Sequence, residues 1–310
     1  MNIIFMGTPD FSVPILRALA KKYRVVLVVT QPDKPKGRKK RLAKPPVKEA
    51  AEKLGLEVFQ PRKLRDQVDH VLSFEPDLIV TAAYGQILPG KLLDTPKYGA
   101  INVHASLLPR LRGGAPIQRA IERGHSESGV TIMKMGRGMD TGPILRKRAL
   151  PIEADETAGS LFDKLSLLGR DLLMETLDDY IAGTIEPVPQ NDEEATYAYA
   201  IKRGEEALDL NIPADVLERK VRAFHPAPNT YLEIEGKRLK VLKADADMTV
   251  DEGRPGEVLK PSKEGPRIRC KKGALLLKEV QPPSKKPMDG LSFMNGAGRT
   301  WLETGKNLLE

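Results

Sequence analysis

The stretch MNIIFMGTPDFSVPILRALAKKYRVVLVVT, residues 1–30, decides the fold of this chain. Two short runs of apolar, β-branched residues, 2–6 and 25–30, predict β-strands, and residues 12–22 between them have the apolar spacing of a helix. Pro14 stands early in that helix, where its ring is tolerated because the first-turn N–H groups lack intrahelical partners. The stretch therefore predicts a β-α-β unit, the building block of a parallel sheet.

The alternation of strands and helices continues beyond this unit. Further strands are predicted at residues 57–59, 78–82, 99–104 and 129–135, and further helices at 47–54, 115–123 and 158–182. This order indicates a mainly parallel sheet that is covered on both faces. The turn at residues 7–11 lacks the G-x-G-x-x-G spacing, so NAD or FAD binding has little support. The turn either lines a small-molecule site or is purely structural.

Composition changes between residues 183 and 199, where prolines, amides and a short acidic run are typical of a linker. After a predicted helix at 213–224 follow five short predicted strands: 230–235, 238–244, 256–259, 267–270 and 274–280. Short strands between Gly and Pro turns favour a small closed β-barrel. We therefore expect an α/β fold with a Rossmann-like, mainly parallel sheet domain at 1–184, a linker at 185–204 and a C-terminal OB-like β-barrel domain at 205–310.

The composition is that of a globular protein, with 40% hydrophobic and 30% charged residues among 310. No apolar run approaches the roughly 20 residues that span a bilayer. The N-terminus lacks the basic region and cleavage site of a signal peptide. We expect a cytoplasmic protein with no membrane segment and, in the absence of a long exposed apolar stripe, a monomer.

Metal chemistry has little support in the sequence. Cys270 is the single cysteine, which excludes an internal disulfide and every multi-cysteine zinc pattern. The four histidines are scattered, and none has the i, i+4 spacing of a helical metal site: His70, His104, His125 and His225. We therefore expect no metal.

A basic stretch follows the second predicted strand. Residues 33–44 are too polar to bury and too rich in Pro, Gly and Lys to be regular, so we expect a mobile surface loop. The loop contains Arg38, Lys39, Lys40 and Arg41. Its charges either are simply solvated or bind an anion such as a phosphodiester backbone. Its place at the carboxyl end of a strand favours binding, and the net charge of +8 is compatible with a polyanionic partner.

The segment NVHASLLP, residues 102–109, offers side chains suited to acyl transfer. Asn102 and His104 are two residues apart, so on a strand both side chains leave the same face. Downstream, Asp140 lies in a Met-Asp-Thr-Gly-Pro turn. Asn can donate a hydrogen bond to an oxyanion, His can move a proton, and a carboxylate can orient the His and stabilise its charged form. The alternative is a structural histidine at a strand end and an ordinary Asp turn.

Several motifs together resemble the methionyl-tRNA formyltransferase family, from residue 3 to residue 301. They are GTPDF at 7–11, TQPD at 30–33, AYGQILP at 83–89, NVHASLLP at 102–109, MDTGP at 139–143, RAFHP at 222–226 and LEIEG at 232–236. The resemblance implies formyl transfer from 10-formyltetrahydrofolate to the α-amine of methionine on initiator tRNA, without a metal. Asn102, His104 and Asp140 match the family's catalytic positions.

The resemblance also implies binding residues. The folate-binding positions that it matches are Ser106, Leu107, Leu108 and Pro109, with Gln86, Ile87 and Leu88 lining the pterin pocket. Arg38 matches a loop arginine used in tRNA recognition, and Lys39, Lys40 and Arg41 belong to the same basic loop.

Two other functions remain open at this point. The chain could be another formyltetrahydrofolate-dependent formyltransferase or hydrolase that acts on a small molecule, but such an enzyme has no evident use for a basic barrel after residue 205. It could also be a non-catalytic RNA-binding module, which the complete set of Asn102, His104 and Asp140 argues against.

Overall fold

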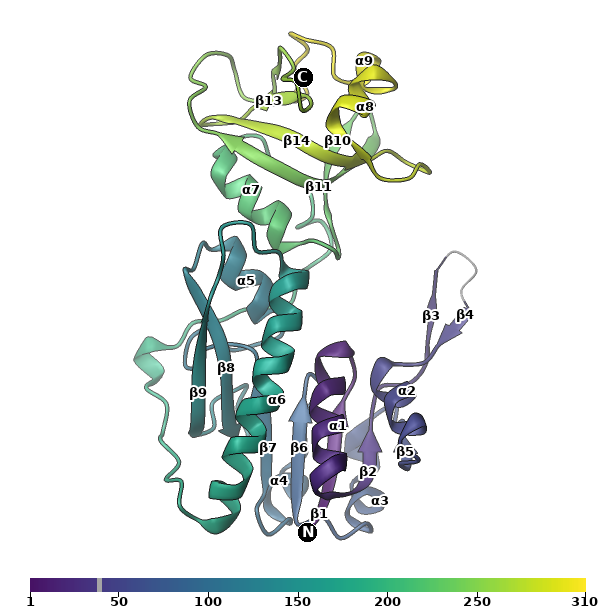
Figure 1. Cartoon of the computed structure of the whole chain (residues 1–310), viewed down its shortest axis with the longest axis vertical. Helices are drawn as coiled ribbons and strands as arrows, with labels where there is room; N and C mark the ends of the chain where they lie inside the picture. Colours follow the sequence, from purple (N-terminus) through teal and green to yellow (C-terminus); the bar gives the residue numbers. More distant parts are fainter. Residues whose placement is uncertain (38–40) are drawn as a thin grey trace. The chain divides into compact units, whose positions relative to one another are not determined.

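The computed structural model describes residues 1–37 and 41–310, which divide into two compact units (Figure 1). One unit comprises residues 1–116, 127–151 and 162–199. The other comprises residues 117–126, 152–161 and 200–310. The helices of the described ranges are all too short or too polar to span a bilayer.

The first unit is built on a seven-stranded sheet. In spatial order its strands are β5 (Val58–Phe59), β2 (Arg24–Val29), β1 (Asn2–Gly7), β6 (Leu78–Ala82), β7 (Ala100–His104), β8 (Glu127–Lys134) and β9 (Ile144–Pro151). The first five strands run parallel, whereas β8 and β9 pair antiparallel. The mainly parallel sheet predicted from the sequence is confirmed, although the antiparallel pairing of its last two strands carried no signal in the apolar pattern.

Helices cover both faces of this sheet. The helices before residue 200 are α1 (Val13–Lys22), α2 (Pro46–Lys53), α3 (Val68–Leu72), α4 (Gly90–Asp94), α5 (Pro116–Glu122) and α6 (Ala158–Ala182), with 3-10 turns at Asp10–Ser12, Leu64–Asp66 and Asp192–Glu194. On one face, Val71 of α3 and Leu92 of α4 pack with Ile4 of β1. On the other, Gly169 of α6 lies so close to Val103 of β7 that an added Cβ would be 2.9 Å from the valine Cγ1. Both faces of the central strands are therefore buried.

The basic stretch is more regular than its composition suggested. β3 (Lys34–Lys36) and β4 (Arg41–Ala43) pair antiparallel and form a hairpin that extends away from the sheet (Figure 1). The expectation of a wholly irregular loop is thus corrected, because backbone ladder bonds need no apolar side-chain pattern. Arg38, Lys39 and Lys40 lie outside the described residues.

The second unit carries an antiparallel sheet in the order β10-β11-β14-β13-β12, with β15 paired to β14. Besides nearly all of α5 and the first turn of α6, its elements are α7 (Ala214–Ala223), β10 (Thr230–Ile234), β11 (Lys237–Asp247), β12 (Val258–Leu259), β13 (Arg267–Arg269), β14 (Ala274–Gln281), β15 (Met288–Asp289), α8 (Gly290–Asn295) and α9 (Gly298–Trp301). The five predicted strands are confirmed. The closed OB-like barrel is not confirmed, since within the described residues β10 and β12 are the two ends of the sheet and do not pair with each other.

Helices, and not closure of the sheet, cover the apolar face of the second unit. Leu217 and Val221 of α7 share one buried cluster with Leu239 of β11 and Leu277 of β14. Phe293 of α8 belongs to the same cluster and is fully buried. A sheet that is covered in this way buries its apolar side chains without needing a ladder between its two edge strands.

Gly129 lets β8 approach its neighbours closely. A Cβ at this position would lie 2.3 Å from the backbone oxygen of Arg148 on β9 and 2.5 Å from Cδ2 of Leu107. Backbone atoms of a paired strand cannot move aside alone. Gly90, at the start of α4, is different, because the nearest atom to a Cβ there would be 3.7 Å away.

We expect Gly129→Ala to destabilise the protein by about 1–3 kcal/mol, the usual cost of overpacking. Gly90→Ala is the matched control, and its free energy of unfolding should stay unchanged or rise slightly because alanine lowers the entropy of the unfolded chain. Chemical denaturation of both variants measures the difference. Equal midpoints for the two would contradict the close approach of β8 and β9.

Candidate active site

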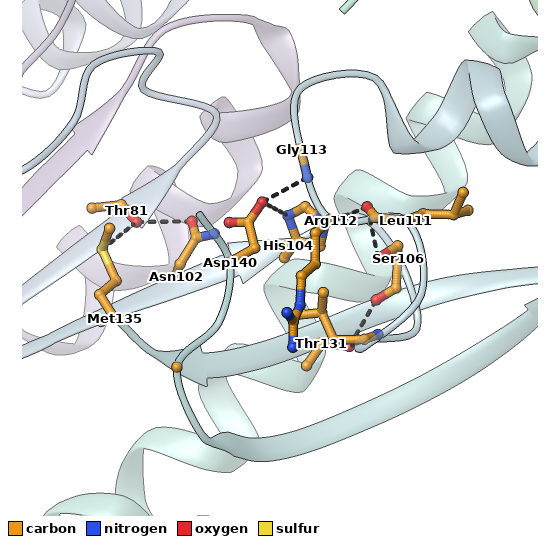
Figure 2. A network of polar contacts seen from close by, with 12 residues as sticks. Thr81, Asn102, His104, Ser106, Leu111, Arg112, Gly113, Thr131, Met135 and Asp140 are labelled. Atoms are coloured by element: carbon orange, nitrogen blue, oxygen red, sulfur yellow. Dashed lines mark hydrogen bonds and ion pairs between the residues drawn. The ribbon is translucent and has the colours of Figure 1, made fainter. Parts of the chain in front are cut away.

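Polar side chains gather at the carboxyl ends of β6 and β7. Thr81 of β6 is directly opposite Asn102 of β7 in the parallel register. His104 is the last residue of β7, and its side chain leaves the strand on the same face as that of Asn102. Figure 2 shows these side chains together with Asp140, which comes from the loop between β8 and β9.

The Asn102 amide is oriented by Thr81. The buried Thr81 hydroxyl donates a hydrogen bond to Oδ1 of Asn102 over 2.8 Å. This bond engages the amide oxygen, so the amide NH₂ group remains the donating end. In Figure 2 that nitrogen is directed toward Asp140. The pair therefore presents N–H donors at the carboxyl edge of the sheet.

The His104 ring is held by a backbone carbonyl. The side chain is only 6% exposed, and its Nε2 lies 3.1 Å from the carbonyl oxygen of Leu111. Because a carbonyl can only accept, Nε2 carries a hydrogen and Nδ1 is the nitrogen available for proton transfer. Leu111 has a φ of +60°, an uncommon conformation for a bulky residue and one that tends to occur at functional sites.

Asp140 faces Nδ1 of His104. Its Oδ2 lies 3.7 Å from that nitrogen, which is an ion-pair distance and too long for a hydrogen bond. The same Oδ2 accepts a 2.8 Å hydrogen bond from the backbone N–H of Gly113. A Cβ on Gly113 would lie 2.8 Å from the carbonyl oxygen of Ala198, so this close backbone approach requires glycine. The structure thus places an amide, an imidazole and a carboxylate from two distant segments side by side.

The loop after β7 is fixed by buried hydroxyl groups. Ser106 is fully buried, donates from Oγ to the carbonyl of Arg110 over 2.7 Å, and accepts at its own carbonyl from Oγ1 of Thr131. Thr131 also accepts from the N–H of Leu108, which is buried too. Pro109 is likewise buried, and Leu107 is half-buried against Gly129. These four residues of the expected folate motif shape the loop, and three of them have buried side chains.

The other expected folate residues lie on the segment after β6. Gln86 anchors it, because its Oε1 accepts from the N–H of Leu64 over 2.8 Å and its Nε2 donates to the carbonyl of Pro61. Ile87 is 88% exposed, whereas Leu88 is buried in the core cluster on the α3 and α4 face. Ile87 therefore offers the apolar side chain that is open to a ligand on this segment.

Two residues with nucleophilic or acidic side chains are poor catalysts here. Burial raises the pKa of Tyr84, which follows β6, to about 12, so the phenol stays protonated at neutral pH. Burial also raises the pKa of the Cys270 thiol to about 11, which leaves almost no reactive thiolate. Within residues 1–37 and 41–310, no group of three or more His, Cys, Asp or Glu side chains could hold a metal ion.

Sequence reasoning missed Thr81, Leu111 and Gly113. Thr81 lies in an otherwise apolar strand. Leu111 acts through its backbone carbonyl and Gly113 through its backbone N–H, and a pattern of side chains cannot predict such contacts. Of the expected tRNA-contacting residues, Arg41 is exposed on β4. In the described structure Arg41 makes no hydrogen bond or ion pair with Asn102, His104 or Asp140.

Comparisons with known proteins identify the family. Residues 1–177 match the formyl transferase family, and residues 200–298 match the formyl transferase C-terminal domain. A methionyl-tRNA formyltransferase from Geobacillus thermodenitrificans (strain NG80-2) is 50% identical over 301 residues, or 96% of this chain and 94% of that protein. One from Listeria monocytogenes serotype 4b (strain CLIP80459) is 48% identical over 306 residues, or 98% of each chain.

The fold also resembles a solved structure with little sequence identity. It is an N-formyltransferase from Helicobacter canadensis in complex with folinic acid and dTDP-3-aminofucose, with a TM-score of 0.65 at 18% identity. The match covers 89% of this chain and 98% of that one. Two matching domains and relatives about half identical over nearly their whole length show that this chain belongs to the formyl transferase family.

Proposed function

We infer that this protein transfers the formyl group of 10-formyltetrahydrofolate to the α-amino group of methionine on initiator tRNA, which supports the start of translation. The observation that carries this function is the 50% identity, over nearly the whole of both chains, to a relative named methionyl-tRNA formyltransferase. The formyl donor is a co-substrate of the family, and the described residues of this chain offer no metal cluster.

In this proposal, Asn102 stabilises the oxyanion. The neutral amine attacks the formyl carbon, a C–N bond forms, and the carbonyl oxygen gains negative charge. The NH₂ group of Asn102 is the donor, since Thr81 already engages its oxygen. One such donor in a preorganised site contributes about 3 kcal/mol to transition-state stabilisation.

His104 relays the proton in the same proposal. Its Nδ1 takes the proton that the attacking amine loses and gives it to N10 of the folate as the bond between N10 and the formyl carbon breaks. The Leu111 carbonyl supports this assignment, because it fixes the hydrogen on the other ring nitrogen. The Asp140 carboxylate faces Nδ1 and stabilises the imidazolium that forms between the two proton transfers.

For folate binding we propose the loop after β7 and the segment after β6. The residues are Ser106, Leu107, Leu108, Pro109, Gln86, Ile87 and Leu88. Ile87 and Leu107 have apolar side chains that are not fully buried and suit the flat pterin ring. The buried members of the set act through the backbone and the shape of the loop.

For tRNA binding we propose the basic stretch of residues 33–44, whose sequence contains Arg38, Lys39, Lys40 and Arg41, together with the exposed face of the second unit. On β11 the side chains alternate, so that Leu239 is buried while Arg238 and Lys240 are exposed. The Arg238 guanidinium lies 4.4 Å from the centre of the Tyr231 ring. Cationic and aromatic groups on one face suit a phosphodiester chain and its bases.

The remaining expectations complete the proposal. We assign the catalytic domain to residues 1–184, the linker to 185–204 and the tRNA-binding domain, with an OB-like fold, to 205–310. We further propose a cytoplasmic monomer, since charged initiator tRNA is found in the cytoplasm and the exposed large apolar residues are scattered along the chain.

The hydroxyl of Thr81 gives a first test. We expect Thr81→Val to lower kcat for formyl transfer by about tenfold, the cost of one lost orienting hydrogen bond of about 1–1.5 kcal/mol. Thr81→Ser is the matched control, and it should keep most of the activity because the hydroxyl remains. Steady-state kinetics with methionyl-tRNA measure both variants. A Thr81→Val enzyme as fast as wild type would show that the Asn102 amide needs no such orientation.

The basic hairpin gives a second test, and with it a test of the function itself. Wild-type protein should formylate charged initiator tRNA and not free methionine, glycinamide ribonucleotide or amino sugars. Arg38→Ala should lower kcat/KM for methionyl-tRNA on the order of tenfold, because one lost nucleic-acid contact costs about 1–3 kcal/mol. The affinity for the folate donor should not change.

Arg17→Ala is the control for the hairpin, because Arg17 is an exposed arginine on α1. It should leave both kcat/KM and folate affinity near the wild-type values. Equal loss of folate affinity and tRNA activity in Arg38→Ala would contradict the role of the hairpin. Preferential formylation of a small amine by the wild type would contradict the proposed function.

A further inference from the structure

We propose that Gln190 and Arg112 are positioning residues that hold the catalytic carboxylate of Asp140 in its working place. This inference rests on the proposed function, because it assigns these residues to the same formyl-transfer site. Neither residue lies on a strand of the seven-stranded sheet. Gln190 belongs to the segment whose composition is that of a linker.

The backbone of Asp140 needs external support. Asp140 has a φ of +53°, in the left-handed region, which aspartate adopts more readily than most residues but still uncommonly. Such conformations persist when surrounding contacts hold them, and they cluster at functional sites. The loop also turns back sharply onto β8, since a Cβ on Gly142 would lie 1.8 Å from the carbonyl oxygen of Lys134.

Gln190 supplies that support from one side. Its Nε2 donates to the carbonyl oxygen of Asp140 over 2.8 Å and to that of Gly142 over 2.7 Å. Both hydrogens of one amide are thus used on the two carbonyls that bracket the turn. A single side chain therefore holds the Asp140–Thr141 and the Gly142–Pro143 peptide groups.

Arg112 determines which way the Gln190 amide points. Its guanidinium donates to Oε1 of Gln190 from Nε over 3.1 Å and from Nη2 over 2.9 Å, and Nη2 also donates to Asp192 over 2.8 Å. Arg112 is only 2% exposed. A guanidinium has no acceptor and a backbone carbonyl has no donor, so the amide cannot flip without losing all four of its hydrogen bonds.

The two supports act on the same carboxylate from adjoining residues. Arg112 controls Gln190, which holds the Asp140 backbone, and the next residue, Gly113, donates its N–H to Oδ2 of Asp140. Figure 2 shows Arg112 and Gly113 next to Asp140 and His104. Residues 112 and 113 therefore act on both parts of Asp140: Arg112 on its backbone, through Gln190, and Gly113 directly on its carboxylate.

Two substitutions separate positioning from folding. Gln190→Leu removes every hydrogen bond of the amide. Gln190→Glu keeps an acceptor for Arg112, so the buried guanidinium stays paired, but it loses both donors to the Asp140 loop and points an oxygen at two carbonyls. Asn191→Ala is the control, because the exposed Asn191 side chain bonds only within its own turn, to Glu193 and Glu194.

The experiment is a double-mutant cycle with Asp140→Ala, measured as kcat for formyl transfer to methionyl-tRNA. In the wild-type background, Gln190→Leu and Gln190→Glu should each lower kcat on the order of 10²-fold, as misplacement of a catalytic group by about 1 Å does. KM for the folate donor should change little, and Asn191→Ala should match wild type. In the Asp140→Ala background, the same Gln190 substitutions should cost almost nothing further, since a residue that acts through Asp140 has nothing left to position.

A second measurement keeps the result interpretable if the double variants are too slow. The long-range ¹H–¹⁵N spectrum of the His104 imidazole should change in Gln190→Leu as it does in Asp140→Ala, because both remove the carboxylate from Nδ1. Equal fold losses in the two backgrounds, or a His104 spectrum like that of wild type, would overturn the proposal. A wild-type protein without activity on methionyl-tRNA would instead overturn the proposed function on which the proposal rests.

Discussion

The hydrogen bond from the Gly113 N–H to the Asp140 carboxylate is the contact on which the site depends. It joins the loop after β7 to the loop between β8 and β9, and these two segments are far apart in the sequence. Without this bond the Asp140 carboxylate would not be held next to His104 by a hydrogen bond, because its Oδ2 is too far from Nδ1 of His104 to accept one. Position 113 needs glycine for a separate reason, since a side chain there would collide with the carbonyl group of Ala198.

The sheet and the loops divide the work of building the site. β6 and β7 place Thr81, Asn102 and His104 by strand register alone, which is rigid because both faces of the strands are buried. The loops add groups that register cannot supply: the Leu111 carbonyl that sets the His104 tautomer, and the carboxylate of Asp140. Leu111 and Asp140 both have positive φ values, so two residues that act on His104 have uncommon backbone conformations.

The sequence predicted the elements whose side-chain pattern is local and regular. The helix expected at residues 158–182 is α6 with the same bounds, and the period of two on β7 correctly placed Asn102 and His104 on one face. It did not predict β9, because Arg146, Lys147 and Arg148 interrupt the apolar pattern of this edge strand. The sequence also predicted that the second sheet closes into a barrel, which the structure does not confirm. The pattern of short strands cannot show that α7 and α8 cover the apolar face of the sheet instead.

Within the site, the sequence could nominate side chains but not their partners. Thr81, Gly113 and Gln190 contact the nominated residues across 21, 27 and 50 positions, and contacts at such separations leave no mark on local composition. Gln190 shows this most clearly, because the polar, proline-containing segment around it has the composition of a linker while its side chain holds the Asp140 turn.

The charge of Asp140 is the most direct test of the account, and Asp140→Asn isolates it. An asparagine can still accept the Gly113 hydrogen bond through Oδ1, so the loop stays in place while the negative charge facing His104 is lost. In a single-turnover measurement of formyl transfer to methionyl-tRNA, we expect this variant to react at least about 10²-fold more slowly than wild type with its folate affinity retained. Transfer at the wild-type rate would contradict the claim that amide, imidazole and carboxylate act as one site.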